Sequence, residues 1–165
     1  VICLLKFMGI LLLVAAGSFA GFQESHKLAQ REKNLEAFLR FLQNAETEIR
    51  YSALPVAGVV ARHSGELPFL RRCAALCREG EGFTGAWERA VRESPDFTGE
   101  DEALLLRFGR GFGATDVEGQ LAHCQLTKGL LAQRLAEARE EKKQKARLYQ
   151  MLGVLGGLGT ALLLC

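Results

Sequence analysis

The sequence has little net charge and little proline, and each of these features excludes a class of protein. Its 21 Lys+Arg residues nearly balance its 19 Asp+Glu residues, which leaves a formal net charge of +2. This balance argues against a strongly basic nucleic-acid-binding protein. Only three prolines interrupt 165 residues, and no segment alternates polar and apolar residues over a useful length. We therefore expect a single globular domain without a β-sheet and without a nucleic-acid partner.

The common catalytic and nucleotide-binding motifs are missing as well. The glycine cluster at 109–113 invites comparison with a phosphate-binding loop, but it lacks a preceding strand and a Gly-Lys-Ser/Thr ending. A turn that needs small residues and positive φ explains the cluster better. The three histidines, His26, His63 and His123, do not combine with serine and aspartate into a recognisable triad. We predict no enzyme activity and no cofactor.

The five cysteines include no CxxC pair, which argues against a zinc site. Cys73 and Cys77 are four residues apart and share one helix face, while His123 and Cys124 lie elsewhere in the chain. The apolar neighbours of Cys73 and Cys77 favour small core residues over ligands. The alternative is a metal- or redox-responsive sensor that uses Cys73, Cys77, His123 and Cys124 together.

Charge is almost absent from both ends of the chain. Residues 1–22 and 148–165 carry one charged side chain, Lys6. Helices over 7–22 and 148–165 would extend about 24 Å and about 27 Å, against ~30 Å for the hydrocarbon core of a bilayer. We therefore predict transmembrane helices at 1–22 and 148–165, with a helical-bundle domain at 23–147 between them.

A cleaved signal peptide is the alternative interpretation of the first segment. Lys6 would form its basic region, residues 7–17 its apolar core, and the small-x-small sequence at 18–20 its cleavage site. The mature protein would then be an extracytoplasmic structural protein anchored by its tail. The helical pattern that continues without a break after Gly21 favours an uncleaved span.

Basic residues gather at both membrane-proximal ends of the middle domain. They are Lys27, Arg31, Lys33, Arg139, Lys142, Lys143, Lys145 and Arg147. On the opposite side of the membrane, the basic groups would be at most Lys6 and the N-terminus. This asymmetry predicts that the middle domain is cytoplasmic, and its basic flanks are suited to anionic lipid headgroups.

The middle of the chain has the pattern of successive helices. Over 24–52, apolar residues recur at steps of three, four and seven, which predicts one buried stripe. Its members are Leu28, Leu35, Phe38, Leu39, Leu42, Ala45 and Ile49. Further helices are expected at 56–63, 67–79, 84–92 and 100–112, and in a long run that follows residue 115. The predicted fold class is all-α: an antiparallel bundle of about six helices flanked by N- and C-terminal transmembrane helices.

Capping signals predict where three of these helices begin. Thr84 is a candidate N-cap for the helix that continues to residue 92. Thr98 and Asp101 have the spacing of a capping box, and so do Thr115 and Glu118. We expect the first box to open the helix over 100–112 and the second to open the long run after residue 115.

Several motifs also occur together in an order that is typical of one family. They are Ala20-Gly21-Phe22, Glu46-Thr47-Glu48-Ile49-x-Tyr51, Leu54-Pro55, Trp87 with Ala90, Leu105-x-x-Phe108-Gly109-x-x-x-Gly113-x-Thr115-Asp116-x-Glu118-Gly119-Gln120 with His123, and the tail Tyr149, Leu152-Gly153 and Leu155-Gly156-Gly157-Leu158. With these motifs the chain resembles the stage III sporulation protein AB family of endospore-forming bacteria over essentially its whole length.

The resemblance implies a non-enzymatic scaffold. The middle domain would be similar to the inner-membrane platform protein of type II secretion and type IV pilus machines. It would belong to the channel complex between mother cell and forespore, on the mother-cell side of the membrane around the forespore. There it would dock the operon's cytoplasmic ATPase. Other channel subunits, the lipid bilayer and further copies of the chain are the remaining expected partners.

Two of the matched motifs supply the candidate partner-binding residues. They are Glu46, Glu48, Tyr51, Asp116, Glu118 and Gln120. An acidic patch of this kind would suit a basic surface on an ATPase. The alternative is that these side chains cap or pair helices inside the bundle and hold the first long helix against the last.

Overall fold

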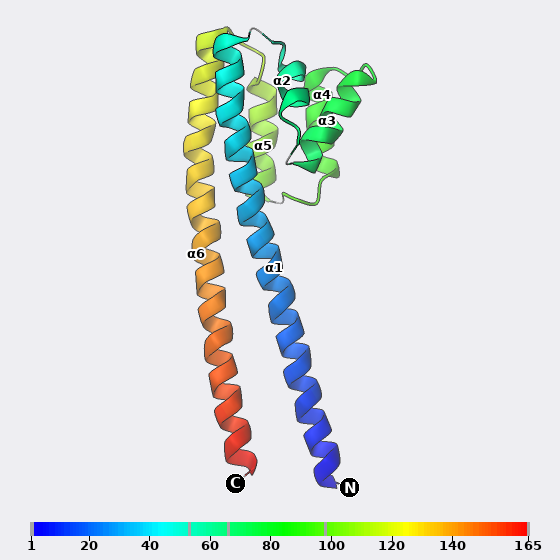
Figure 1. Ribbon diagram of the computed structural model, residues 1–165, viewed down its shortest axis with the longest axis vertical. Helices are drawn as coiled ribbons and strands as arrows, with labels where there is room; N and C mark the ends of the chain where they lie inside the picture. Colours follow the sequence, from blue (N-terminus) through cyan, green and yellow to red (C-terminus); the bar gives the residue numbers. More distant parts are fainter. Residues whose placement is uncertain (1, 53, 66, 98, 165) are drawn as a thin grey trace. The chain divides into compact units, whose positions relative to one another are not determined.

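The computed structural model of the protein describes residues 2–52, 54–65, 67–97 and 99–164 (Figure 1). Side chains are described from residue 23 to 149 and at 151 and 152, apart from 24, 53, 66 and 98. The described residues form six helices and no strand: α1 (Ile2–Tyr51), α2 (Val56–Arg62), α3 (Pro68–Arg78), α4 (Phe83–Glu93), α5 (Glu100–Gly111) and α6 (Val117–Leu164). The prediction of an all-α fold of about six helices is confirmed.

The chain divides into two compact units. The first, which we call the helical domain, comprises Arg31–Glu137 and so contains α2 to α5 with the adjoining parts of α1 and α6. The second unit is formed by the segments of the chain before and after it. α1 and α6 are each one unbroken helix, as expected for sequences without an internal proline.

The residues that the structure describes include no helix long and apolar enough to cross a membrane. The predicted spans at 1–22 and 148–165 lie almost entirely outside the described side chains. The spans and the domain boundaries placed next to them therefore stay predictions.

The core of the helical domain is built around Trp87 of α4. Its ring centroid lies 5.3 Å from that of Phe69 on α3 and 5.5 Å from that of Phe108 on α5. Its Nε1 donates a hydrogen bond to the Leu105 carbonyl oxygen at 2.9 Å. Because Trp87 is 1% exposed, this bond satisfies a donor that would otherwise be buried without a partner. The tryptophan thus joins three helices at one point.

α1 supplies another side of the core, where the periodic stripe predicted it. Leu35, Phe38, Leu42 and Ala45 are fully buried. Phe41 lies outside the predicted stripe but is also buried, and it stacks on Phe38 with a centroid distance of 5.8 Å. The buried face is wider than the stripe because rings from α3, α4 and α5 all reach α1.

The predicted cap of α4 is wrong by two positions. α4 begins at Phe83 with Gly82 at its N-cap, so Thr84 lies within the first turn. The backbone of Gly82 is extended, and this conformation is enough to enter the helix without a side-chain cap.

The predicted capping box of α5 is also wrong, although the helix begins where it was expected. Gly99 is the N-cap, and its φ of 59° lies in the left-handed region that favours glycine. Asp101 forms an ion pair with Arg31 of α1, and Thr98 lies outside the described residues. The Asp101 carboxylate, which the local pattern assigned to a helix cap, therefore pairs with Arg31 of another helix instead.

The glycine cluster at the end of α5 serves close packing more than turning, since Gly109 and Gly111 lie within the helix and only Gly113 follows it. Within it only Gly113 has a positive φ, of 90°. A β-carbon at Gly109 would lie 2.1 Å from Trp87 Cδ1, and one at Gly111 would lie 2.6 Å from His123 Cε1. A larger residue at either position must displace a ring. The predicted turn therefore explains Gly113, while the rings explain the other two glycines.

Candidate partner-binding region

The two motifs that carry the candidate residues meet at one end of the helical domain. Figure 1 shows the C-terminal end of α1 beside the start of α6 at this end. Lys128 of α6 forms an ion pair with Glu46 of α1, and Phe112, directly after α5, contacts Phe41 of α1 with a centroid distance of 6.4 Å. The end of α1 and the start of α6, far apart in the sequence, thus lie at the same end of the helical domain.

Glu46 links α1 to α6. Its Oε2 accepts a hydrogen bond from Lys128 Nζ at 2.8 Å, and the two side chains are only 18% and 28% exposed. Its Oε1 is buried and has no hydrogen-bond partner among the described atoms. A partly buried charge depends strongly on its partner, so this ion pair stabilises the contact between α1 and α6.

Glu48 links α1 to the end of α2. It accepts hydrogen bonds from Arg62 at 3.0 and 3.1 Å, and His63 Nε2 lies 3.1 Å from its Oε1. Hydrogen bonds from the side chains of Ser52, Arg62 and His63, in that order of effect, lower the pKa of Glu48 to about 2. The carboxylate is therefore ionised across the physiological range, and its charge is already matched inside the domain.

Asp116 and Gln120 shape the corner between α5 and α6. Asp116 Oδ1 accepts a hydrogen bond from the Gly119 N–H at 3.0 Å, which makes Asp116 the N-cap of α6 in place of the predicted Thr115. Gln120 is 5% exposed, and its Oε1 accepts a hydrogen bond from the Gly113 N–H at 2.8 Å. These two residues set the backbone of the corner.

Tyr51 and Glu118 are the candidates that project from the domain. Tyr51 is 79% exposed at the end of α1, and Glu118 is exposed in the first turn of α6. Val117 beside it is the first residue of α6 and is 53% exposed. We call Tyr51, Val117 and Glu118 the tip patch. An exposed aromatic, an aliphatic and a carboxylate are a combination suited to contact another protein.

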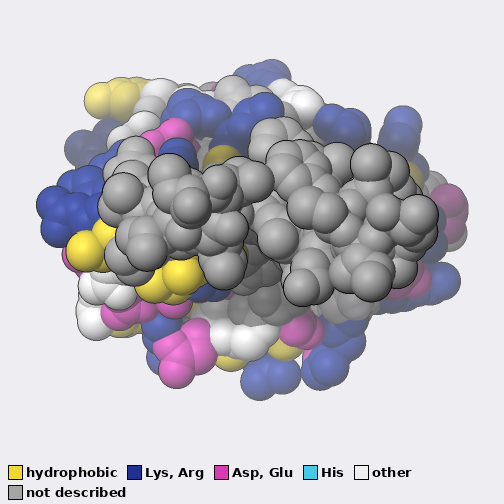
Figure 2. Space-filling view, turned by 90° about the horizontal axis from the view of Figure 1, so that it is seen from below, with side chains coloured by type: hydrophobic (Ala, Val, Ile, Leu, Met, Phe, Trp, Pro, Cys, Tyr) yellow, Lys and Arg dark blue, Asp and Glu magenta, His cyan; other side chains and the backbone are white. Residues whose placement is uncertain are grey.

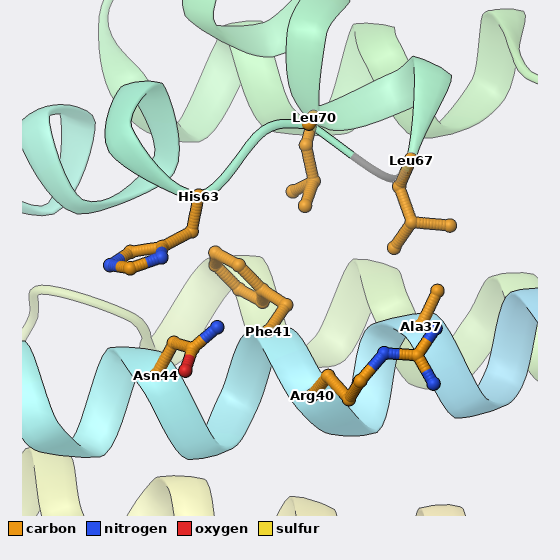
Figure 3. A pocket seen from close by; sticks show the side chains of 8 residues that line it. Ala37, Arg40, Phe41, Asn44, His63, Leu67 and Leu70 are labelled. Carbon is orange, nitrogen blue, oxygen red and sulfur yellow. The ribbon is translucent and has the colours of Figure 1, made fainter.

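A pocket of about 200 Å³ lies between α1 and the segment that joins α2 to α3 (Figure 3). Phe41 and Leu70 line its apolar part, and Arg40, Asn44 and His63 its polar part. The sequence had given no indication of this pocket, because the residues that form it come from three elements.

The cysteines do not form the site that the sensor hypothesis needs. Burial raises the pKa of Cys73 and of Cys124 to about 12, which makes both thiols poor nucleophiles and poor ligands. The ring of His123 stacks on Phe108 at 5.2 Å, and its Nε2 lies 3.0 Å from the Phe108 carbonyl oxygen. Within the described ranges, no three His, Cys, Asp or Glu side chains gather as metal ligands would.

The described residues that are visible in Figure 2 carry surface charges of both signs. Figure 2 shows Lys and Arg side chains in several groups with Asp and Glu between them. This distribution agrees with the small net charge of the sequence. A docking surface on this face would depend on particular side chains rather than on a uniform field.

The fold and the gathered motifs define a class of protein, a helical bundle with a candidate contact region at one end. The chain belongs to the stage III sporulation protein AB family, whose model matches residues 6–165. It is 24% identical over 170 residues to the stage III sporulation protein AB of Bacillus subtilis (strain 168), a match that covers 98% of this chain and 99% of that protein. No solved structure matches the chain. Family membership gives the protein a role related to sporulation.

Proposed function

We propose that the chain is a membrane-anchored, non-enzymatic platform subunit of the channel complex between mother cell and forespore, and that it docks a cytoplasmic secretion-type ATPase. The family match along nearly the whole chain is the observation that carries this proposal. The geometry adds a compact helical domain whose matched motifs meet at one end. No residue is assigned a catalytic role.

The candidate residues divide by what they contact. Glu46 and Glu48 pair with Lys128 and with Arg62 and His63, so their charges are used within the helical domain. Asp116 and Gln120 hold the corner before α6. Of the candidate residues, those of the tip patch are therefore the ones exposed for contact with the ATPase. The other four residues position the tip patch.

Changing the tip patch is expected to weaken ATPase docking without unfolding the domain. Tyr51→Ala combined with Glu118→Lys should raise the Kd for the purified ATPase by about tenfold, because an aromatic anchor and a complementary charge are both lost. The measurement is titration of the ATPase against the full chain in lipid nanodiscs. Circular dichroism should be unchanged, since both side chains are exposed.

Glu79→Lys is the matched control, because Glu79 is an exposed carboxylate at the end of α3, outside the tip patch. It should leave the Kd within about twofold of the unchanged chain. If the tip variant binds the ATPase as tightly as this control does, the tip patch is not the docking surface. If the unchanged chain does not bind the ATPase at all, the platform function itself is wrong.

The proposed location is the membrane around the forespore, with the helical domain on the mother-cell cytoplasmic side. Eight basic residues flank the two apolar segments on the side of the domain, and this supports a cytoplasmic domain. An extracytoplasmic, tail-anchored protein is the alternative, and it requires cleavage near residues 18–20. α1 runs through these residues without a break, which favours the uncleaved form.

Cysteine labelling is expected to place the helical domain in the cytoplasm. Gln43→Cys and Gln125→Cys put thiols at exposed positions on α1 and α6. Cys3, Cys77 and Cys165 are replaced by alanine, while Cys73 and Cys124 stay, because a thiol that is buried with a pKa near 12 reacts poorly. A membrane-impermeant maleimide should label both introduced thiols only after the cells are opened. Labelling in intact cells would instead establish the extracytoplasmic alternative.

A further inference from the structure

A groove runs between α5 and α6 in the helical domain, and none of the tip-patch residues lines it. It encloses about 400 Å³. Glu100, Ala103, Leu104 and Arg107 line it from α5, and Leu130, Gln133 and Arg134 from α6. The four α5 residues follow one another at steps of three, one and three, so they share one face over about 10 Å of helix. The groove therefore extends along two turns of α5.

The floor of the groove is apolar and continues onto the surface of α6. Leu104 is 5% exposed, Leu130 is half-buried, and Ala103 is exposed. Leu126 precedes Leu130 by one turn on the same face of α6, and it is 65% exposed. A leucine left in water beside an apolar groove extends the surface available for burial.

The charges at the two ends of the groove differ. At one end, Arg134 pairs with Glu100 and also with Glu137 at 2.9 Å, so its charge is balanced. At the other end, Arg107 is exposed and makes no ion pair or hydrogen bond with any described residue. The groove thus presents one uncompensated guanidinium next to an apolar floor, and this combination favours a ligand with a carboxylate beside aliphatic side chains.

The backbone of α6 is also accessible beside the groove. Gly129 is exposed inside the helix, and a β-carbon there would meet no atom within 4 Å. Glycine is disfavoured inside a helix, and at this position no contact within the described chain requires it. A glycine here permits the close approach of another helix.

We infer that the α5–α6 groove binds an acidic amphipathic helix of a partner protein. The helix lays aliphatic side chains at i and i+4 on Ala103, Leu104 and Leu130, and its carboxylate pairs with Arg107. This is the helix-in-groove mode of recognition. The inference rests on the proposed scaffold function, since it gives the platform a second contact surface besides the tip patch.

The test uses the full chain in phosphatidylcholine nanodiscs and two synthetic helical peptides. One peptide carries leucine at i and i+4 with glutamate beside it, and the other has lysine in place of glutamate. Fluorescence anisotropy, corrected with empty nanodiscs, should show binding of the acidic peptide only. Arg107→Glu should weaken that binding by about tenfold and allow the lysine peptide to bind instead. Leu126→Gln should weaken it by about threefold.

Arg78→Glu is the matched control, since Arg78 is an exposed arginine on α3. It should leave the affinity for the acidic peptide unchanged. Equal affinity of Arg107→Glu and Arg78→Glu for this peptide would overturn the inference. So would a change in the oligomeric state of the chain caused by Arg107→Glu without a change in peptide affinity, because the occupant would then be a second copy.

The failure of this inference can be told apart from the failure of the proposed function. If the ATPase binds the chain but neither peptide does, the groove is not a helix-binding site and the platform function stands. If the acidic peptide binds in an Arg107-dependent way but the ATPase does not, the groove is a binding site and its partner is a different protein.

Discussion

Replacing Gly109 by alanine is expected to lower the stability of the helical domain by about 3 kcal/mol or more. The added β-carbon would lie 2.1 Å from Trp87 Cδ1 and 2.4 Å from its Nε1. The tryptophan ring cannot easily move away, because Nε1 is hydrogen-bonded to the Leu105 carbonyl and the rings of Phe69 and Phe108 pack against it. Urea unfolding of the full chain in detergent measures the loss.

The readout is direct because the sequence has one tryptophan. Trp87 is buried at the centre of the core, so its fluorescence reports on the packing that the substitution disturbs. Gly129→Ala is the matched control: it makes the same chemical change inside a helix, at a site where a β-carbon meets nothing within 4 Å. It should raise stability by up to about 1 kcal/mol. Equal midpoints for the two variants would show that the core has room beside Trp87.

Replacing Asp101 by alanine is expected to cost about 3 kcal/mol. Asp101 is 3% exposed, and it accepts hydrogen bonds from Arg31 Nε at 2.6 Å and from Arg31 Nη2 at 3.1 Å. This two-pronged contact joins α1 to the first turn of α5. Removal of the carboxylate leaves a guanidinium that is only about a quarter exposed, at 27%, without its main counter-charge. Denaturant unfolding, with Trp87 fluorescence as the signal, measures the effect.

Arg89→Ala is the control for this second prediction. Arg89 also forms ion pairs, with Glu93 and Glu81, but these pairs lie at the surface. Its loss should move the unfolding midpoint far less than Asp101→Ala does, because exposed ion pairs contribute little to stability. The double variant Arg31→Met with Asp101→Leu should recover part of the loss, since it replaces both charges of this pair by apolar side chains. A single Asp101→Ala variant as stable as Arg89→Ala would show that the buried pair does not hold α1 to α5.

The helices were predictable because their signals are local. Apolar residues recur at helical spacing in each helix of the helical domain, and on α4 Trp87, Ala90 and Val91, three and one residues apart, are all buried. The separate roles of Glu46 and Glu48 could also be anticipated. Residues two apart on a helix point to different faces, and one of these carboxylates contacts α6 while the other contacts α2.

What could not be predicted depends on partners that are distant in the sequence. Asp101 has the spacing of a capping residue, but Arg31 lies 70 residues away and takes its carboxylate. Gly109 and Gly111 belong to a cluster that suggests a turn, but the rings of Trp87 and His123 are what require them. The α5–α6 groove shows no signal in either helix alone.

The sequence by itself therefore determined the all-α class, the succession of helices, the apolar ends and the family, because periodicity, composition and ordered motifs are properties of neighbouring residues. Only the tertiary structure decided which candidate side chains form ion pairs within the helical domain and which remain exposed to solvent. The physical reason is that a carboxylate pairs with whichever cation the fold brings to it. Glu46 and Glu48 lie inside the domain next to Lys128 and Arg62, whereas Tyr51 and Glu118 face water.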